Sequence, residues 1–367
     1  MKKALSVLLA LVLVTSITAC RKKTEEPTAS PSPEPTQNAT QQPTQSPQTP
    51  EPVTPEPTPE PSEEPAEDPV EPLAFYFPEA QSRPVAVVVD NGGDRAFPQA
   101  GLGHAQIVYE MLAEGGITRY LALFWESEAN LIGPVRSARH YMLDFILPFD
   151  AMLAHVGGSP QAMADIPKLG IESINSLVKA GYIFEDMTND PGNWQDTFTY
   201  MYKINQYISG FQIPTASGKV HLPQYYDVIT IPATGITANT VMLTYSPQAY
   251  NAYAYDTERM QYFRNRNGKT HLEKESGLPF GVTNIIVQFM ENKTIPGDKE
   301  GRQNLTTVGE GKGYFITAGK AVDITWEKAD RSAPTRYYGK DGKEIIWNPG
   351  NTWIQVMPLN AEVMILQ

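Results

Sequence analysis

The sequence predicts an α/β N-terminal domain and a mostly antiparallel β C-terminal domain, both behind a disordered proline-rich tether. A lipoprotein-like leader ends at Cys20, and residues 24–72 are rich in proline and contain no aromatic side chain. Beyond residue 73, strand and helix patterns alternate until about residue 220, where the pattern becomes that of short strands. The predicted boundaries are 1–19 for a signal peptide, 20–72 for the tether, 73–220 for the α/β domain and 221–367 for the β-rich domain.

The leader predicts export and lipid anchoring. Lys2 and Lys3 precede the apolar run ALSVLLALVLV, which is too short for a membrane-spanning helix. The run ends in ITAC (17–20), which resembles the lipobox of bacterial lipoproteins. We therefore expect a membrane partner through lipid on Cys20, with each buried acyl methylene contributing ~0.8 kcal/mol. The expected location is the extracytoplasmic face of a bacterial cell membrane; an ordinary secretory leader with an incidental cysteine is the alternative.

Cys20 is the single cysteine of the chain. A mature domain without cysteine has no intramolecular disulfide, no cysteine-ligated zinc and no thiol nucleophile. Its fold must therefore depend on a large apolar core.

The tether accounts for most of the acidic charge. The net charge is −12, and residues 24–72 contain 11 acidic side chains and neither Lys nor Arg. Such a composition buries no core and favours an extended chain. Since no basic stripe occurs elsewhere, we expect no nucleic-acid partner.

The first folded half alternates strand and helix patterns, which predicts a partly parallel sheet. The expected strands are PVAVVVDN (84–91), ITRYLALFWES (117–127), LIGPV (131–135) and AMLAHV (151–156). The expected helices are HAQIVYEMLAE (104–114), the segment 136–147 and a segment starting at Ser159.

The second half predicts short strands joined by turns. Hairpin turns are indicated by Asn267-Gly268 and Asp341-Gly342. The expected strands include VMLTYS, TNIIVQFM, GYFITA, VDITWEK and TWIQVMP. Trp326, Trp347 and Trp353 are interpreted as core residues, and a carbohydrate-binding groove is the alternative.

The stretch GPVRSARHYMLDF (133–145) contains the first candidate binding residues. If 136–147 is helical, Arg136 and Arg139 share one face at the start of a helix. Two guanidinium groups there would form a multidentate receptor for a carboxylate or phosphate. Alternatively, each arginine pairs with an acidic neighbour and only stabilises the domain; the acidic candidates are Glu110, Glu114 and Asp144.

Further candidates follow the predicted parallel strands. Such residues gather at the carboxyl ends of strands, where α/β proteins bind ligands. The glycines allow a close backbone approach, and the helix start at Ser159 favours anions. These candidates are Asp90, Asn91, His155, Gly157, Gly158 and Ser159.

Catalytic roles are open for two of these residues. His155 would be a general base oriented by Asp90, or a hydrogen-bonded core histidine. Ser159 is expected to be a helix cap rather than a nucleophile. The histidine spacing predicts no metal site, and no motif predicts a cofactor.

The longest motifs are RPVAVVVDN, IVYEMLAEGGITRYLALF, IGPVRSAR, HVGGSPQA and ITWEKADRSAPTRYY. Together they resemble the YerB family of bacterial lipoproteins over about residues 83–358. The resemblance implies an exported, two-part lipoprotein, and it implies no catalytic role because the family is a domain of unknown function. This chain departs from the family at Gly192, where members commonly carry a histidine.

Two functions remain open from the sequence. The first is a non-enzymatic envelope protein that binds an anionic cell-wall polymer or an envelope protein through the Arg/His crevice. The second is a hydrolase or transferase acting on a cell-wall component, with His155 and Asp90 as acid–base groups.

Overall fold

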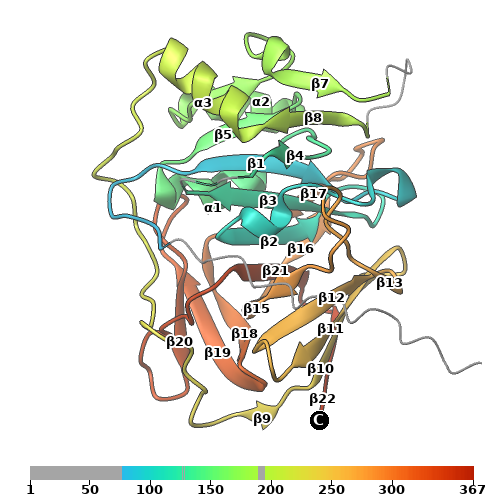
Figure 1. The fold of residues 1–367 in the computed structure, drawn as a ribbon, viewed down its shortest axis with the longest axis vertical. Coiled ribbons are helices and arrows are strands. Elements are labelled where there is room, and N and C mark those ends of the chain that lie inside the picture. The colour runs from blue at the N-terminus through green and yellow to red at the C-terminus, as the bar shows by residue number, and fades with distance from the viewer. Residues whose placement is uncertain (1–76, 126, 128, 189–194) are drawn as a thin grey trace, which may run out of the picture. The chain divides into compact units, whose positions relative to one another are not determined.

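The computed structural model describes residues 77–125, 127, 129–188 and 195–367 (Figure 1). The predicted signal peptide, the tether and Cys20 lie outside the described residues, as does Gly192.

The described residues contain an 11-stranded sheet that runs through both predicted halves. Its strands follow the order β20-β19-β18-β15-β21-β2-β3-β1-β5-β6, and β9 pairs with β19. The bounds, in that order, are Arg336–Gly339, Lys320–Lys328, Gly309–Thr317, Asn284–Met290, Thr352–Pro358, Ile107–Leu112, Thr118–Phe124, Val85–Asp90, Met152–His155, Ser173–Asn175 and, for β9, Ile236–Thr237.

A six-stranded antiparallel sheet is built from the C-terminal half alone. Its order is β13-β12-β11-β10-β22, with β14 paired to β12. The bounds are Lys269–Thr270, Gln261–Arg266, Ala249–Asp256, Thr240–Ser246, Glu362–Leu366 and, for β14, Gly281–Val282. Between β12 and β13, Asn267 and Gly268 both have positive φ (48° and 76°), as the predicted hairpin turn requires.

Smaller sheets and short helices make up the rest of the secondary structure in the described residues. β4 (Leu131–Ile132), β8 (Thr197–Tyr200) and β7 (Phe184–Asp186) form one small sheet, and β16 (Asn292–Thr294) pairs with β17 (Gln303–Leu305). The helices are α1 (Leu143–Ile146), α2 (Pro160–Lys168), α3 (Met201–Gly210), and the 3-10 turns η1 (Asp94–Ala96), η2 (Leu102–His104), η3 (His140–Met142), η4 (Leu147–Phe149) and η5 (Gly181–Ile183).

The predicted fold class is confirmed, and the two parts share a sheet. β21 comes from the C-terminal part but pairs in parallel with both β2 and β15. The N-terminal part therefore completes its sheet with a strand from the other end of the chain. The predicted domain boundary at residue 220 stays a prediction.

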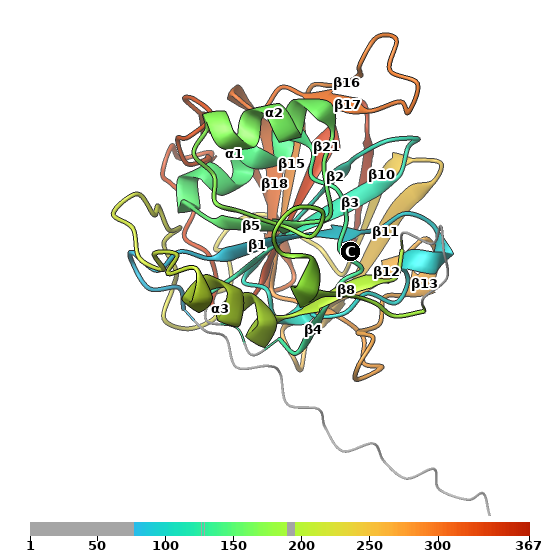
Figure 2. The same cartoon turned by 90° about the horizontal axis from the view of Figure 1, so that it is seen from above.

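Alternate residues of the large sheet pack into two separate cores. Val85, Val87 and Val89 of β1 belong to a cluster that includes α3 and the six-stranded sheet. Ala86 and Val88 belong to the other cluster, which includes α1 and α2. Figure 2 shows α1 and α2 on one side of β1 and β5, with α3, β4 and β8 on the other. Because both faces of the sheet are covered, the sequences of its central strands are continuous apolar runs.

The helix predicted over 104–114 is wrong. Residues 107–112 form β2, and all six are buried between β3 and β21. The run is too short for its periodicity to separate a buried strand from a buried helix. Pairing with β21 makes this segment a strand, and β21 lies more than 240 positions later in the chain.

The helix predicted over 136–147 is wrong at its start. Helical structure begins with η3 at His140, and Arg139 in front of it has extended backbone (φ −118°, ψ 147°). Arg136 instead lies in a segment that hydrogen-bonds to β1, because its amide donates to the Val88 carbonyl at 2.8 Å. The two arginines therefore do not share a helix face.

A fully buried ion pair joins β2 to the six-stranded sheet. The Arg264 guanidinium donates to Glu110 Oε2 at 2.6 Å, and both side chains are 0 % exposed. Asn251 donates to the same carboxylate oxygen, and Thr118 donates to the other. Burial alone would lower the pKa of Arg264, but Glu110, together with Tyr120 and Tyr253, outweighs burial and raises it. We call this group the Glu110–Arg264 network.

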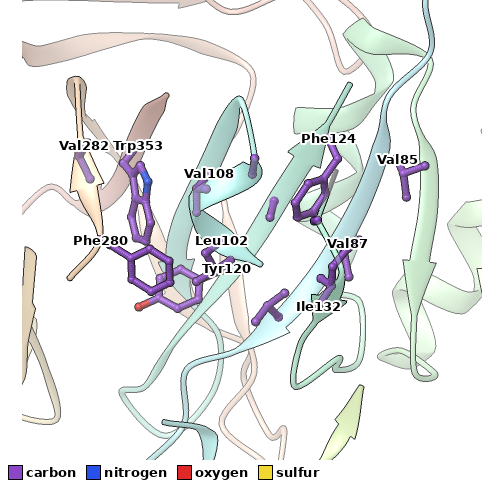
Figure 3. Packing of buried hydrophobic residues seen from close by; sticks show 14 of the residues in the cluster. Val85, Val87, Leu102, Val108, Tyr120, Phe124, Ile132, Phe280, Val282 and Trp353 are labelled. Atoms are coloured by element: carbon purple, nitrogen blue, oxygen red, sulfur yellow. The ribbon is translucent and has the colours of Figure 1, made fainter. Parts of the chain in front are cut away.

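Aromatic rings surround the Arg264 guanidinium. It lies 4.9 Å from the Trp353 ring centroid and 5.5 Å from that of Tyr120. Figure 3 shows these two rings beside Phe280 in the buried cluster. The rings exclude water while their faces stabilise the cation. Trp353 is thus a core residue, as the sequence predicted.

Glu110→Gln is expected to lower the free energy of unfolding by about 3–5 kcal/mol, because it leaves a buried arginine without its counter-charge. Glu110→Gln combined with Arg264→Met should cost less than the sum of the single changes. Urea unfolding followed by circular dichroism measures all three.

The matched control is Arg259→Met, which breaks the exposed pair with Asp256. Such a pair contributes about 0–1 kcal/mol. A Glu110→Gln effect no larger than that of the control would contradict a central role for the network.

Candidate functional site

The candidate site forms where β1 and β5 separate. The two strands pair in parallel only from Val85 to Val87. Beyond that point a segment inserts between them: the Asp90 amide donates to the Pro134 carbonyl and the Val156 amide to the Arg136 carbonyl. Such a division of a sheet at strand ends is where α/β folds place ligands.

Asp90 is the carboxylate at this point, and it is 1 % exposed. Its Oδ1 accepts from the Gly92 amide at 3.0 Å, and its Oδ2 accepts from the Gln195 side chain at 3.1 Å. Arg136 Nε lies 3.1 Å from the same Oδ2. Burial lowers the pKa of Arg136, an effect that Asp90 opposes.

Arg139 forms a bidentate pair with Glu114. Its Nε donates to Oε2 at 2.9 Å and its Nη2 to Oε1 at 2.7 Å. Arg119 donates to the same Oε1 at 2.7 Å, so one carboxylate holds two arginines. Burial would raise the pKa of Glu114, but the two guanidiniums outweigh it and lower that pKa. This is the structural pairing that the sequence left open.

We call Asp90, Glu114, Arg119, Arg136 and Arg139 the arginine edge. Three cations face two carboxylates, so the formal charge of the group is +1. Arg119 is 0 % and Arg139 8 % exposed at the side chain, whereas Arg136 is 23 % exposed. Solvent therefore reaches the group at two side chains, Arg136 and the carboxylate of Glu114, which is 21 % exposed.

Asn91 is turned into the Glu110–Arg264 network instead of toward solvent. Its side-chain amide donates to Glu110 Oε1 at 3.1 Å and to the Thr118 hydroxyl at 2.6 Å. Its Oδ1 accepts from Arg266. The geometry gives Asn91 a structural role at the end of β1.

His155 is 0 % exposed, and both ring nitrogens are engaged. Nδ1 lies 2.6 Å from the Gly157 carbonyl, which only accepts, so Nδ1 carries the proton. Nε2 then accepts from the Ser173 hydroxyl at 2.8 Å. Burial lowers the pKa of His155, which keeps the ring neutral. Neither ring nitrogen of His155 is therefore hydrogen-bonded to Asp90, the residue predicted to orient it.

The Gly157–Ser159 turn links β5 to α2. Gly157 has φ +61°, which favours glycine, and its amide donates to Asn175 Oδ1. The Ser159 amide donates to the Ala138 carbonyl, and its Oγ accepts from the Ala162 amide at 3.2 Å. Ser159 is therefore the N-cap of α2, and Gly158 pairs with Ala138 beside it.

Sequence reasoning did not select Arg119 or Gln195. Arg119 sits in the otherwise apolar strand β3, and a charge in such a run signals a buried pair. Gln195 bonds to Asp90 from 105 positions away in the chain, so no local sequence pattern predicts this contact.

Among the described residues, no cluster of three or more His, Cys, Asp or Glu side chains is placed to hold a metal ion. In the same part of the chain, no helix combines the length and apolar character needed to cross a bilayer.

The buried histidine predicts a pH dependence of stability. Because folding lowers the pKa of His155, the unfolded chain binds more protons below its own pKa of about 6.5. Stability is therefore lost as the pH falls below 6.5. His155→Gln should reduce the loss between pH 7.5 and 5.5 by at most ~1.4 kcal/mol.

The measurement is urea unfolding at both pH values. His221→Gln, a change at an exposed histidine, is the matched control and should follow the wild type. Equal pH dependence in His155→Gln and wild type would contradict the assignment.

Comparisons with known proteins also divide the chain into an N-terminal and a C-terminal part. The N-terminal domain model of a protein of unknown function (DUF3048) matches residues 77–213, and the C-terminal domain model matches residues 241–354. The "Putative lipoprotein YerB" of Bacillus subtilis is 32% identical over 289 residues, which cover 76% of this chain and 82% of that protein. The crystal structure of YerB from Bacillus subtilis matches with a TM-score of 0.68 at 28% identity, covering 80% of this chain and 99% of that one. The chain therefore belongs to the DUF3048 family, the family that includes YerB.

Proposed function

We propose that this protein is a lipid-anchored envelope protein that binds an anionic envelope component at the arginine edge. One observation carries the proposal: Arg136 is the partly exposed guanidinium of a group with net charge +1, and the other two arginines are held by Glu114. An anionic polymer of the cell wall is the partner class that fits this charge.

The surroundings of Arg136 support binding of an anion. Arg119 and Arg139 of the same group are buried, so their charge is less screened than that of surface arginines. Asp90 holds the Arg136 side chain in place at Nε. A positioned guanidinium loses less entropy on binding than a free one.

The same residues favour binding over catalysis. His155 is buried with both ring nitrogens bonded, and the Ser159 hydroxyl caps α2. A hydrolase or transferase would need an accessible acid–base group at this edge. Asp90 itself is held by Gly92, Gln195 and Arg136.

The membrane location rests on the leader and on the relative. The ITAC motif ends at Cys20, and the related YerB carries the name of a lipoprotein. We infer that acyl chains on Cys20 hold the protein at the extracytoplasmic face, with residues 20–72 as the spacer.

Arg136→Lys is expected to weaken binding of a glycerol-phosphate oligomer to the detergent-solubilised protein about tenfold, because lysine lacks the bidentate fork. Calorimetric titration at low and high salt measures the affinity. Binding should also weaken as salt rises.

Arg259→Lys changes another ion-paired arginine, far from β1 in the turn after β11, and is the matched control. The proposal fails if both variants bind as the wild type does. It also fails if Arg136→Lys lowers binding only in proportion to a loss of folded protein.

Cys20→Ala is expected to abolish incorporation of a fatty-acid analogue and to release the protein from the membrane fraction. Metabolic labelling followed by fractionation measures both. Label retained in Cys20→Ala would place the lipid elsewhere.

A further inference from the structure

A separate cavity of about 230 Å³ lies on the opposite side of the large sheet from α3. It is bounded by η4, the segment 220–223 and β20. Its inner wall is aromatic and almost fully buried, formed by Tyr109, Phe145, Phe149, Tyr337 and Trp347. None of these residues belongs to the arginine edge.

One polar group in this wall lacks an internal partner. Tyr109 is 4 % exposed, yet its hydroxyl makes no hydrogen bond with any residue in the described part of the chain. By contrast, the Tyr337 hydroxyl donates to Gln288 at 2.9 Å. The hydroxyl lies in the cavity lining, where it can donate to water or to a ligand oxygen. Burial raises the pKa of Tyr109, and the group stays a neutral donor.

The mouth of the cavity is polar. Arg336 and Glu344 form an ion pair of 2.6 Å with side chains 48 % and 39 % exposed. An exposed pair of this kind contributes little to stability. It does place a planar donor group and a carboxylate acceptor beside the aromatic wall, together with the exposed His221.

We propose that this cavity binds a single sugar ring. A pyranose has apolar C–H faces that pack on aromatic rings and hydroxyls around its rim that need donors and acceptors. The volume lies below that of pockets for drug-sized ligands, which suits about one ring. A flat aromatic molecule would cover the wall but would leave Arg336 and Glu344 unused. The site is independent of the anion-binding proposal.

The test is calorimetric titration of the full-length, detergent-solubilised protein with N-acetylglucosamine, and separately with benzyl alcohol as a non-sugar ring. Saturable binding of the sugar is expected. Tyr109→Phe keeps the ring and removes the unpartnered hydroxyl, so it should weaken sugar binding about two- to tenfold without lowering the melting temperature.

Two variants serve as controls. Tyr338→Phe removes a hydroxyl that bonds to Glu327 outside the cavity wall and should leave sugar affinity unchanged. Arg136→Lys should also leave it unchanged, which separates this site from the arginine edge. Trp347→Phe should remove the sugar-induced change in tryptophan fluorescence.

Three outcomes would overturn the inference. The first is no saturable binding of the sugar. The second is binding of benzyl alcohol in place of the sugar, which would assign the cavity to aromatic ligands. The third is a Tyr109→Phe affinity equal to that of the wild type, which would place the sugar elsewhere.

Discussion

The ion pair between Glu110 and Arg264 is the constraint on which the arrangement of the two halves depends. Both side chains are 0 % exposed, so neither charge has water to replace its partner. Removing a charge from such a site costs much more than the pair itself contributes. Strand β2 of the large sheet and β12 of the six-stranded sheet must therefore keep their positions relative to each other for either charge to be tolerated.

From this pair, hydrogen bonds lead to the arginine edge. Arg264 contacts His271 Nδ1 at 2.6 Å, and His271 Nε2 contacts Gln99 Oε1 at 2.7 Å. The Gln99 side chain then donates to the Asp90 carbonyl at 2.9 Å. Burial and the neighbouring arginines lower the pKa of His271, which fits a neutral ring that accepts from Arg264. The C-terminal half thus fixes the end of β1 where Asp90 holds Arg136.

The elements that depend on a local sequence pattern are predicted correctly. The prediction fails where contacts between residues far apart in the chain determine the structure. β1, β5 and the Ser159 cap of α2 follow from an apolar run or a turn signal, and the structure has them. The pattern of residues 104–114 predicts a helix because nothing local shows the pairing of β2 with β21, which lies far along the chain. The sequence predicts Arg136 on a helix because nothing local shows that its segment inserts beside β1. The fold brings the candidate residues to one region, but the side chains of His155 and Asn91 are buried and hydrogen-bonded to protein groups.

Both proposed binding surfaces need contributions from each half of the chain. The cavity takes Tyr109 from β2 and Trp347 from the C-terminal part. The arginine edge is built from residues of the N-terminal half, yet Arg266 of β12 holds the backbone of Asn91 beside Asp90. Neither surface would form on an isolated half with its present geometry. Under both proposals, the shared sheet is a requirement for binding as well as a packing solution, since separation of the halves would remove both proposed sites together.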